Sequence, residues 1–242
     1  MNDAETNRRL LRHYASARTP WGRWRLNLQC RFKWFLWCCR MHEGLLFKRA
    51  FDLFVSLVLL LLLSPLFLLI GILIKLEDNG PVLFAQIRVG QFGREFKLFK
   101  FRSMCVDAEE RLEQLISKNR HAEGVTFKII GDPRITRIGR WLRKYSLDEL
   151  PQLYNVLIGD MSLVGPRPPL PREVERYSLA DRRRLAALPG VTCFWQISGR
   201  SEISFIGQVK LDLRYIESRS FWVDVKILAR TVPAVLLGEG AY

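Results

Sequence analysis

The chain has 242 residues, with 38 Lys or Arg against 24 Asp or Glu, which gives a formal net charge of +14 at pH 7. That charge predicts an anionic partner, which would be a nucleic acid, an acidic membrane surface or a phosphorylated substrate. The five cysteines form no C-x-x-C pair, which argues against a disulfide framework or a zinc site and favours a reducing compartment. None of the three histidines lies near a Ser or Cys nucleophile, so we expect no histidine-based triad.

Residues 1–47 are basic and rich in tryptophan. Cationic and aromatic side chains are interleaved in this segment: Trp21, Arg23, Trp24, Arg25, Arg31, Lys33, Trp34, Phe35, Trp37 and Arg40. The mixture is typical of a helix in the lipid headgroup layer, with its cations on anionic lipids. Single-stranded nucleic acid is bound by the same residue types, but the apolar run that follows favours membrane contact. We therefore expect anionic membrane lipids as partners and no nucleic acid.

An uncharged, leucine-rich run follows from Leu53 to Ile74 and is long enough to enter a bilayer core. Ser64-Pro65 interrupts it midway, and because proline removes one helical hydrogen bond, a kink is expected there. Basic residues flank the run on both sides. This arrangement is consistent with a membrane helix over residues 48–76 that dips in and returns to the same face, although a single pass stays open.

Two alternating runs, Val82–Val89 and Glu95–Arg102, surround a glycine-containing turn and predict a β-hairpin. Its arms carry Arg88, Lys100 and Arg102, each of which could face a phosphate or simply form a solvated face.

Two helices are expected between the hairpin and the next motif. Residues 105–121, with mixed charges, predict a surface helix. A basic helix is expected to begin at Asp132-Pro133, with an amphipathic stripe at i, i+3 spacing: Arg134, Arg137, Arg140 and Arg143. We expect most of these arginines to contact lipid, with the gathering of an anionic substrate as the alternative.

Two adjacent carboxylates, Asp148 and Glu149, stand before an apolar helical pattern in the stretch Ser146–Leu153. Ser146 with Glu149 fits a capping box, which would place both carboxylates in the first turn of a helix. There the helix dipole favours an ionised carboxylate and a bound phosphate. The pair predicts either a nucleophile that works beside a divalent metal or an ordinary capped helix start.

Further along, Gly165-Pro166-Arg167-Pro168 predicts a rigid turn that fixes Arg167 for bidentate phosphate recognition. A second arginine, Arg200, follows Gly199, and Asp212 lies further on. Residues Phe221–Leu237 predict an apolar helix with Pro233 inside it.

From about Phe47 to its end the chain resembles the bacterial sugar transferases, the monotopic phosphoglycosyl transferases that start polysaccharide and glycoconjugate assembly. The motifs that carry the resemblance occur in order: Lys48-Arg49 with Asp52, Ser64-Pro65, Gln86-x-Arg88-x-Gly90, Lys100–Met104, Asp132-Pro133-Arg134, Ser146–Leu153, Gly159–Ser162, Gly165–Pro168, Pro189–Thr192 and Ser198-Gly199-Arg200. Residues 1–47 lie outside it. Larger family members carry further transmembrane helices and another domain in front.

The resemblance implies transfer of a sugar 1-phosphate from a UDP-sugar to polyprenyl (undecaprenyl) phosphate, with release of UMP. Asp148 would be the nucleophile and would hold Mg²⁺, and Glu149 would assist at the metal site or as an acid/base partner. By the same resemblance Arg167 and Arg200 would bind phosphate, and Lys100 and Asp212 would be further active-site residues.

For the fold the resemblance implies a mainly helical α+β protein. A re-entrant helix broken at Ser64-Pro65 would precede a compact cytosolic catalytic domain, residues 77–242, with a small β-hairpin and interfacial amphipathic helices. The chain would lie on the cytoplasmic face of the bacterial inner membrane, and its product would be the substrate of downstream glycosyltransferases. A homodimer is compatible with the sequence. Two alternatives are a non-enzymatic membrane adaptor and a membrane-tethered nucleic-acid binder. No residue in the sequence indicates which sugar is transferred.

Overall fold

The computed structural model describes residues 20–108, 110–111, 131–199 and 203–237. The chain divides into two compact units, residues 1–48 and residues 49–242. In the first unit the described part is the start of helix α2 (Pro20–Leu62), in which the exposed rings of Trp21 and Trp24 stack at 5.0 Å. The predicted helix in the tryptophan-rich segment is therefore confirmed for these residues.

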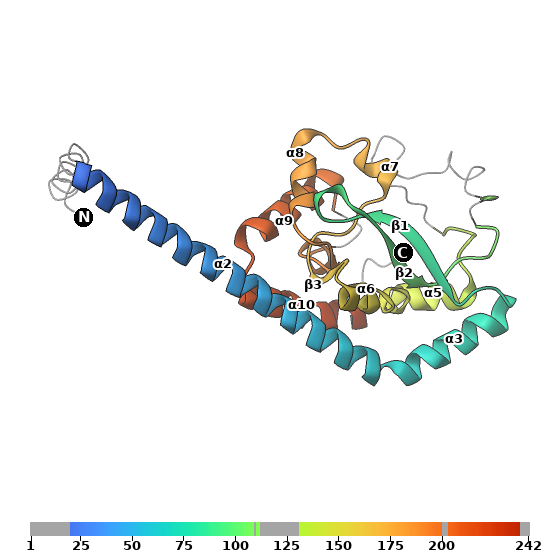
Figure 1. The fold of residues 1–242 in the computed structure, drawn as a ribbon. Helices are drawn as coiled ribbons and strands as arrows, with labels where there is room; N and C mark the ends of the chain where they lie inside the picture. Colours follow the sequence, from blue (N-terminus) through green and yellow to red (C-terminus); the bar gives the residue numbers. More distant parts are fainter. Residues whose placement is uncertain (1–19, 109, 112–130, 200–202, 238–242) are drawn as a thin grey trace. The chain divides into compact units, whose positions relative to one another are not determined.

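In its described residues the second unit is mainly helical with two small sheets, as expected for an α+β fold (Figure 1). After α2 its principal elements are α3 (Ser64–Asp78), β1 (Leu83–Val89), β2 (Glu95–Phe101), α5 (Arg137–Lys144), η3 (Leu147–Glu149), α6 (Gln152–Ile158), β3 (Ser162–Val164), β4 (Gly190–Thr192), η5 (Trp195–Ile197), α9 (Phe205–Ser218) and α10 (Phe221–Leu237). Three short helical segments lie between β3 and β4: α7 (Pro171–Val174), α8 (Leu179–Arg182) and η4 (Arg183–Ala186).

The predicted break at Ser64-Pro65 is confirmed. Helix α2 ends at Leu62, α3 begins at Ser64, and the segment Gly44–Leu62 makes an angle of 59° with α3. Pro65 has no N–H to give to the carbonyl of Leu61, and the Ser64 hydroxyl binds that carbonyl instead, at 2.8 Å. Within the described residues no single helix is long and apolar enough to cross a membrane, but this bent pair meets the length and composition for a broken span or a re-entrant loop.

The predicted hairpin is also confirmed. β1 and β2 pair antiparallel, with Arg88 opposite Phe96 and Lys100 opposite Phe84, and a short helical turn, η1 (Gln91–Gly93), joins them. The hairpin packs with β1 against α7 and with β2 against α6 and η3 (Figure 1). A second sheet, the parallel pair β3 and β4, was not predicted.

Two apolar clusters hold these elements together. The larger joins β2, α6, β3, α9 and α10 around Val156, Met161 and Ile227, with the second half of α2 packed against it. The smaller joins α3 to α5 and η3 through Ile70, Ile74 and Leu142. The C-terminal helix was predicted with its observed bounds, Phe221–Leu237, and contains Pro233.

The arginine stripe was predicted wrongly in part. Asp132 accepts the N–H of Arg134 at 3.0 Å and also binds its guanidinium, which holds this buried arginine in a turn outside the helix. Helix α5 begins only after Thr136, whose hydroxyl accepts the N–H of Gly139 at 2.9 Å. Of the predicted surface helix over 105–121, residues 106–108 form a turn, residues 110–111 are helical, and residues 109 and 112–121 lie outside the described residues.

Candidate active site

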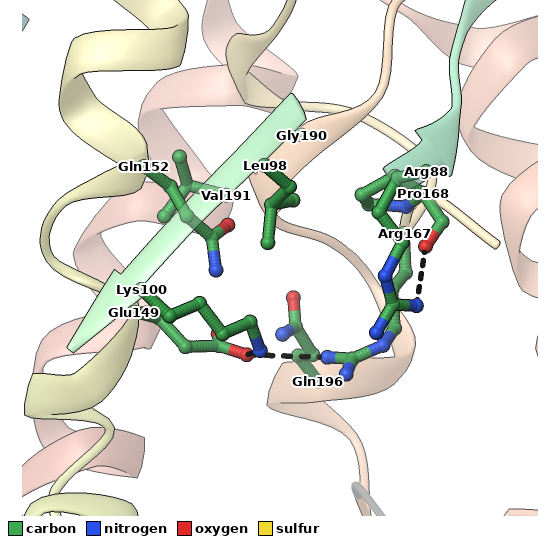
Figure 2. Close-up of a pocket in the computed structure, with 10 residues that line it drawn as sticks. All are labelled: Arg88, Leu98, Lys100, Glu149, Gln152, Arg167, Pro168, Gly190, Val191 and Gln196. Atoms are coloured by element: carbon green, nitrogen blue, oxygen red, sulfur yellow. Dashed lines mark hydrogen bonds and ion pairs between the residues drawn. The ribbon is translucent and has the colours of Figure 1, made fainter. Parts of the chain in front are cut away.

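A small pocket in the second unit gathers side chains from both sheets, two helical turns, helix α6 and one loop (Figure 2). The residues that line it are Arg88, Leu98, Lys100, Glu149, Gln152, Arg167, Pro168, Gly190, Val191 and Gln196. Four of the predicted site residues are among them: Arg88, Lys100, Glu149 and Arg167.

The register of the hairpin explains why two of its cations reach the pocket. Side chains alternate between the faces of a sheet, and cross-strand partners share a face. Arg88 on β1 therefore lies on the same face as Leu98 and Lys100 on β2. Arg102 follows the end of β2 and is not among the residues that line the pocket. Its buried guanidinium forms an ion pair with Asp78 at the end of α3.

The turn that carries the two carboxylates is not the predicted capping box. Ser146 has a left-handed backbone with φ of 53°, and its side chain accepts no capping hydrogen bond. Instead its carbonyl accepts the N–H of Glu149 at 3.2 Å, which forms the 3₁₀ turn η3 three residues before α6 begins. Leu147 and Leu150 pack onto the α3–α5 cluster and bury this turn. Tertiary packing, rather than a local cap, thus positions the carboxylates.

Glu149 is bound by two cations (Figure 2). The Nζ of Lys100 lies 3.0 Å and the Nη1 of Arg167 lies 3.4 Å from the same oxygen, Oε1. Burial opposes ionisation of Glu149, but Lys100, Arg167 and Arg88 outweigh it and lower the pKa to about 2. Glu149 is therefore a carboxylate held in its ionised form.

The surroundings of Asp148 differ from those of Glu149, although the two residues are adjacent. Its side chain is buried, and within the described parts of the chain it forms no hydrogen bond or ion pair. Burial raises the pKa of Asp148, while Lys100 and Arg143 act in the opposite direction. The two carboxylates thus differ in their surroundings, because Glu149 is paired with two protein cations and Asp148 has no such partner among the described residues.

Arg167 lies on a loop that is held from both sides. The carbonyl of Pro169 accepts the N–H of Val89 at 2.9 Å, and that of Pro166 accepts the N–H of Gly190 at 2.9 Å. A side chain on either Gly165 or Gly190 would overlap the facing backbone, so this close approach requires glycine at both positions. The guanidinium of Arg167 stands 5.9 Å over the ring of Trp195. The prediction of a rigid turn that fixes Arg167 is consistent with these contacts.

Arg88 is more constrained than the sequence suggested. Its Nε and Nη2 donate to Gln86 Oε1 at 3.1 and 2.7 Å, and its Nη1 donates to the Pro168 carbonyl at 3.0 Å. Burial lowers the pKa of Arg88 to about 10. It lines the pocket and also holds the Arg167 loop.

Among the other predicted residues, Asp148 adjoins Glu149 but does not itself line the pocket, and Asp212 lies elsewhere. Asp212, on α9, is buried against Arg184 in an ion pair, and neither residue lines the pocket. Burial raises the pKa of Asp212 to about 6, against the effect of Arg184. Arg200 lies outside the described residues.

Three residues of the site were not singled out from the sequence. Gln152 and Gln196 line the pocket, and Trp195 lies under Arg167. A glutamine inside an apolar helical pattern, as at Gln152, is the one signal that could have indicated a polar cavity.

Asp148 is the residue of this region that could serve as a ligand to a magnesium ion. The described residues contain no group of three or more His, Cys, Asp or Glu side chains that could hold a metal. Mg²⁺, however, is commonly bound by one or two carboxylates together with substrate phosphates and water. Asp148, which has no protein partner among the described residues, fits that role.

The pocket is lined by three cations, Arg88, Lys100 and Arg167, and by one carboxylate paired with two of them, a set of side chains whose charge suits phosphate groups. The model of the bacterial sugar transferase family matches residues 43–238. The chain therefore belongs to the bacterial sugar transferase family, as its sequence motifs indicated.

Three relatives illustrate the similarity. The galactosyl transferase CpsE of Streptococcus agalactiae is 48% identical over 201 residues, which cover 83% of this chain and 44% of CpsE. The exopolysaccharide production protein ExoY of Rhizobium meliloti is 45% identical over 198 residues, 81% of this chain and 88% of ExoY. The undecaprenyl-phosphate galactose phosphotransferase of Salmonella typhimurium is 43% identical over 198 residues, 81% of this chain and 41% of that protein. The chain thus spans less than half of two of these relatives and most of the third.

Proposed function

We propose that this protein transfers a sugar 1-phosphate from a UDP-sugar to polyprenyl phosphate, releasing UMP and forming a polyprenyl diphosphate sugar. The family and the printed name of the Salmonella relative support this reaction class. The observation that carries the proposal is the unlike state of the two neighbouring carboxylates. Glu149 is paired with Lys100 and Arg167, whereas Asp148 has no partner among the described residues.

In the first step an oxygen of Asp148 attacks the β-phosphorus of the donor. The bond from that phosphorus to the oxygen bridging the two phosphates breaks, and UMP leaves with the bridging oxygen and its electron pair. The sugar phosphate is then bound to Asp148 as an acyl phosphate. In the second step a phosphate oxygen of the lipid attacks the same phosphorus, and the Asp148 carboxylate leaves. Splitting the transfer in this way replaces one difficult displacement with two easier ones.

Lys100 and Arg167 would supply the positive charge that the reaction needs. The donor brings a diphosphate to a buried site, where fixed positive groups stabilise developing negative charge more strongly than in water. Lys100 and Arg167 are already in place, because Glu149 holds both through one oxygen. Mg²⁺ bound at Asp148 would offset further charge on the diphosphate and favour the ionised carboxylate. Glu149 orients the cations in this proposal rather than acting as the nucleophile.

We also infer that the bent helix pair lies in the bacterial inner membrane with the second unit on the cytoplasmic face. The broken, apolar pair Gly44–Leu62 and Ser64–Asp78 supports this placement. A lipid phosphate lies at the membrane surface, so the site must remain there too. The product would be the substrate of downstream glycosyltransferases that extend the sugar.

The test is UMP release by the purified full-length protein with Mg²⁺, polyprenyl phosphate and a panel of UDP-sugars, beginning with UDP-galactose because CpsE and the Salmonella relative are named for galactose. Donor labelled in the sugar, given without lipid, should leave one label per wild-type chain and none on Asp148→Asn. The matched control is Glu217→Gln, on the exposed face of α9. Full turnover by Asp148→Asn would remove Asp148 as the nucleophile, and release from no donor would contradict the reaction itself.

A further inference from the structure

Two glutamine side chains lie among the charged groups of the pocket. Figure 2 shows the amides of Gln152 and Gln196 turned toward the interior of the pocket that Lys100 and Arg167 also line. Gln152 is only 3% exposed, and its amide has no hydrogen-bond partner among the described residues. Because a buried amide without a partner costs free energy, Gln152 indicates that the pocket receives a polar group of a ligand.

Gln196 is held at one end of its amide by a thiol. The Sγ of Cys193 donates to Oε1 of Gln196 at 3.2 Å. Cys193 directly follows β4 and is 1% exposed, so water does not compete for this hydrogen bond. Burial raises the pKa of the Cys193 thiol, which therefore stays protonated and remains a donor. The amide oxygen of Gln196 is thus already bound within the protein.

The nitrogen end of the same amide is free. Nε2 of Gln196 has no hydrogen-bond partner in the part of the chain that the structure describes, and it carries two N–H donors. A glutamine amide that can turn over offers either its oxygen or its nitrogen to a ligand. With the thiol bound to Oε1, Gln196 offers donors alone, and these suit an anionic oxygen.

The turn that carries Gln196 also supports a cation of the pocket. This turn, η5 (Trp195–Ile197), is closed by the carbonyl of Phe194, which accepts the N–H of Ile197 at 3.3 Å. Within it the ring of Trp195 lies 5.9 Å from the guanidinium of Arg167. One short element therefore places both the amide of Gln196 and the cation of Arg167.

We propose that Cys193 is a positioning residue of the donor site: its thiol holds the Gln196 amide so that Nε2 binds a phosphate oxygen of the UDP-sugar. The inference rests on the proposed function, because it adds a contact to the donor diphosphate of that reaction. Lys100 and Arg167 supply charge, whereas the amide supplies a directed donor without further charge. The phosphate of the lipid acceptor offers the same kind of oxygen, so the experiment must separate the two sources.

The experiment measures the rate of lipid-independent labelling of Asp148 at varied concentrations of labelled UDP-sugar. The KM for polyprenyl phosphate is measured in parallel, in full turnover. The full-length variants are Cys193→Ala, Cys193→Ser, Gln196→Ala and the double variant that combines Cys193→Ala with Gln196→Ala. Cys105→Ala is the matched control, since it removes a partly exposed thiol that has no contact with Gln196.

Gln196→Ala should lower the second-order rate constant of labelling about tenfold or more, because a hydrogen bond to a charged oxygen is lost. Cys193→Ala should lower it about threefold to tenfold, because the amide can then turn its oxygen toward the phosphate. Cys193→Ser keeps a donor and should recover most of the rate. The double variant should equal Gln196→Ala, since a residue that acts only through Gln196 has no effect once that amide is gone. Cys105→Ala, and the KM for polyprenyl phosphate throughout, should match the wild type.

Several results would overturn the proposal. A loss in the double variant equal to the product of the two single losses would show that Cys193 acts independently of Gln196. Labelling of Gln196→Ala at the wild-type rate would remove the amide from donor binding. A change confined to the KM for polyprenyl phosphate would assign the phosphate oxygen to the acceptor.

A further variant decides if Cys193→Ala does not fold. Gln196→Glu keeps an oxygen for the thiol but turns a second, charged oxygen toward the phosphate, so labelling should be lost. Labelling of Gln196→Glu at the wild-type rate would contradict the proposal. A wild-type protein that neither takes up label nor releases UMP would instead be a failure of the proposed function, and the role of Cys193 would fall with it.

Discussion

The side chain of Asn155 binds the strand beside Phe99. Its Oδ1 accepts the Phe99 N–H at 3.0 Å, and its Nδ2 donates to the Lys97 carbonyl at 2.7 Å. Asn155 lies on α6, the helix after the carboxylate pair, and Lys100 follows Phe99 on β2. One buried amide therefore sets the position of Glu149 relative to Lys100.

Replacing Asn155 by Ala should lower both stability and activity. The variant leaves a strand N–H and a carbonyl unpaired in a mostly buried place, which costs about 1–3 kcal/mol. Thermal unfolding in detergent measures the change, with Lys210→Ala, an exposed site on α9, as the control. A melting temperature equal to that of the wild type would contradict the anchoring role.

The pH dependence of activity should report on Lys100. Burial lowers the pKa of Lys100 and Glu149 opposes this, so the alkaline limb of kcat/KM should lie below the ordinary lysine value of 10.5. A lysine is charged below its pKa, and Glu149→Gln removes the opposing charge. The alkaline limb should therefore move to still lower pH in Glu149→Gln. An alkaline limb at the same pH in Glu149→Gln as in the wild type would show that the charge of Lys100 does not control kcat/KM.

Features with a local signal were predicted from the sequence. The hairpin followed from alternation around a glycine turn, the helix break from Pro65, and α10 from its apolar pattern. Each depends on residues that are close in the chain. The candidate cations Arg88 and Lys100 were named because they lie on the arms of this hairpin, and the observed register shows that they share a face.

Features that depend on distant partners were missed. The inward turn of Arg143 depends on Ser103, and the left-handed backbone of Ser146 accompanies burial of Leu147 and Leu150 against α3. The β3–β4 pair has three-residue strands, too short to show a period. Asp212 was assigned to the active site by resemblance, yet its partner in the structure is Arg184.

Restoring a donor at the helix break should straighten the bent pair. Pro65→Ala supplies an N–H for the Leu61 carbonyl, which the Ser64 hydroxyl now binds, and the combined Ser64→Ala change removes that competitor. We expect the residues after Asp78 to change sides of the membrane in part of the population. Cysteine-accessibility labelling in vesicles measures this, with Leu68→Ala as a control on exposed α3 surface. Labelling identical to that of the parent chain would show that the break does not depend on proline.

The ion pair between Arg184 and Asp212 offers a test of what Asp212 does. Both side chains are buried, and a hydrogen bond from Arg184 to the Tyr177 hydroxyl at 3.1 Å extends the cluster. Removing one partner, as in Arg184→Met, leaves a buried charge and should cost about 3–5 kcal/mol of stability. Replacing both, as Arg184→Met with Asp212→Leu, removes both desolvation costs and should recover most of that loss.

Activity of the double variant decides between the two roles. If Asp212 acts only through Arg184, the double variant should regain sugar-phosphate transfer together with its melting temperature. A double variant that is stable but inactive would contradict a purely structural role for Asp212. Stability would then have been restored without sugar-phosphate transfer, and Asp212 would be assigned to the active site again.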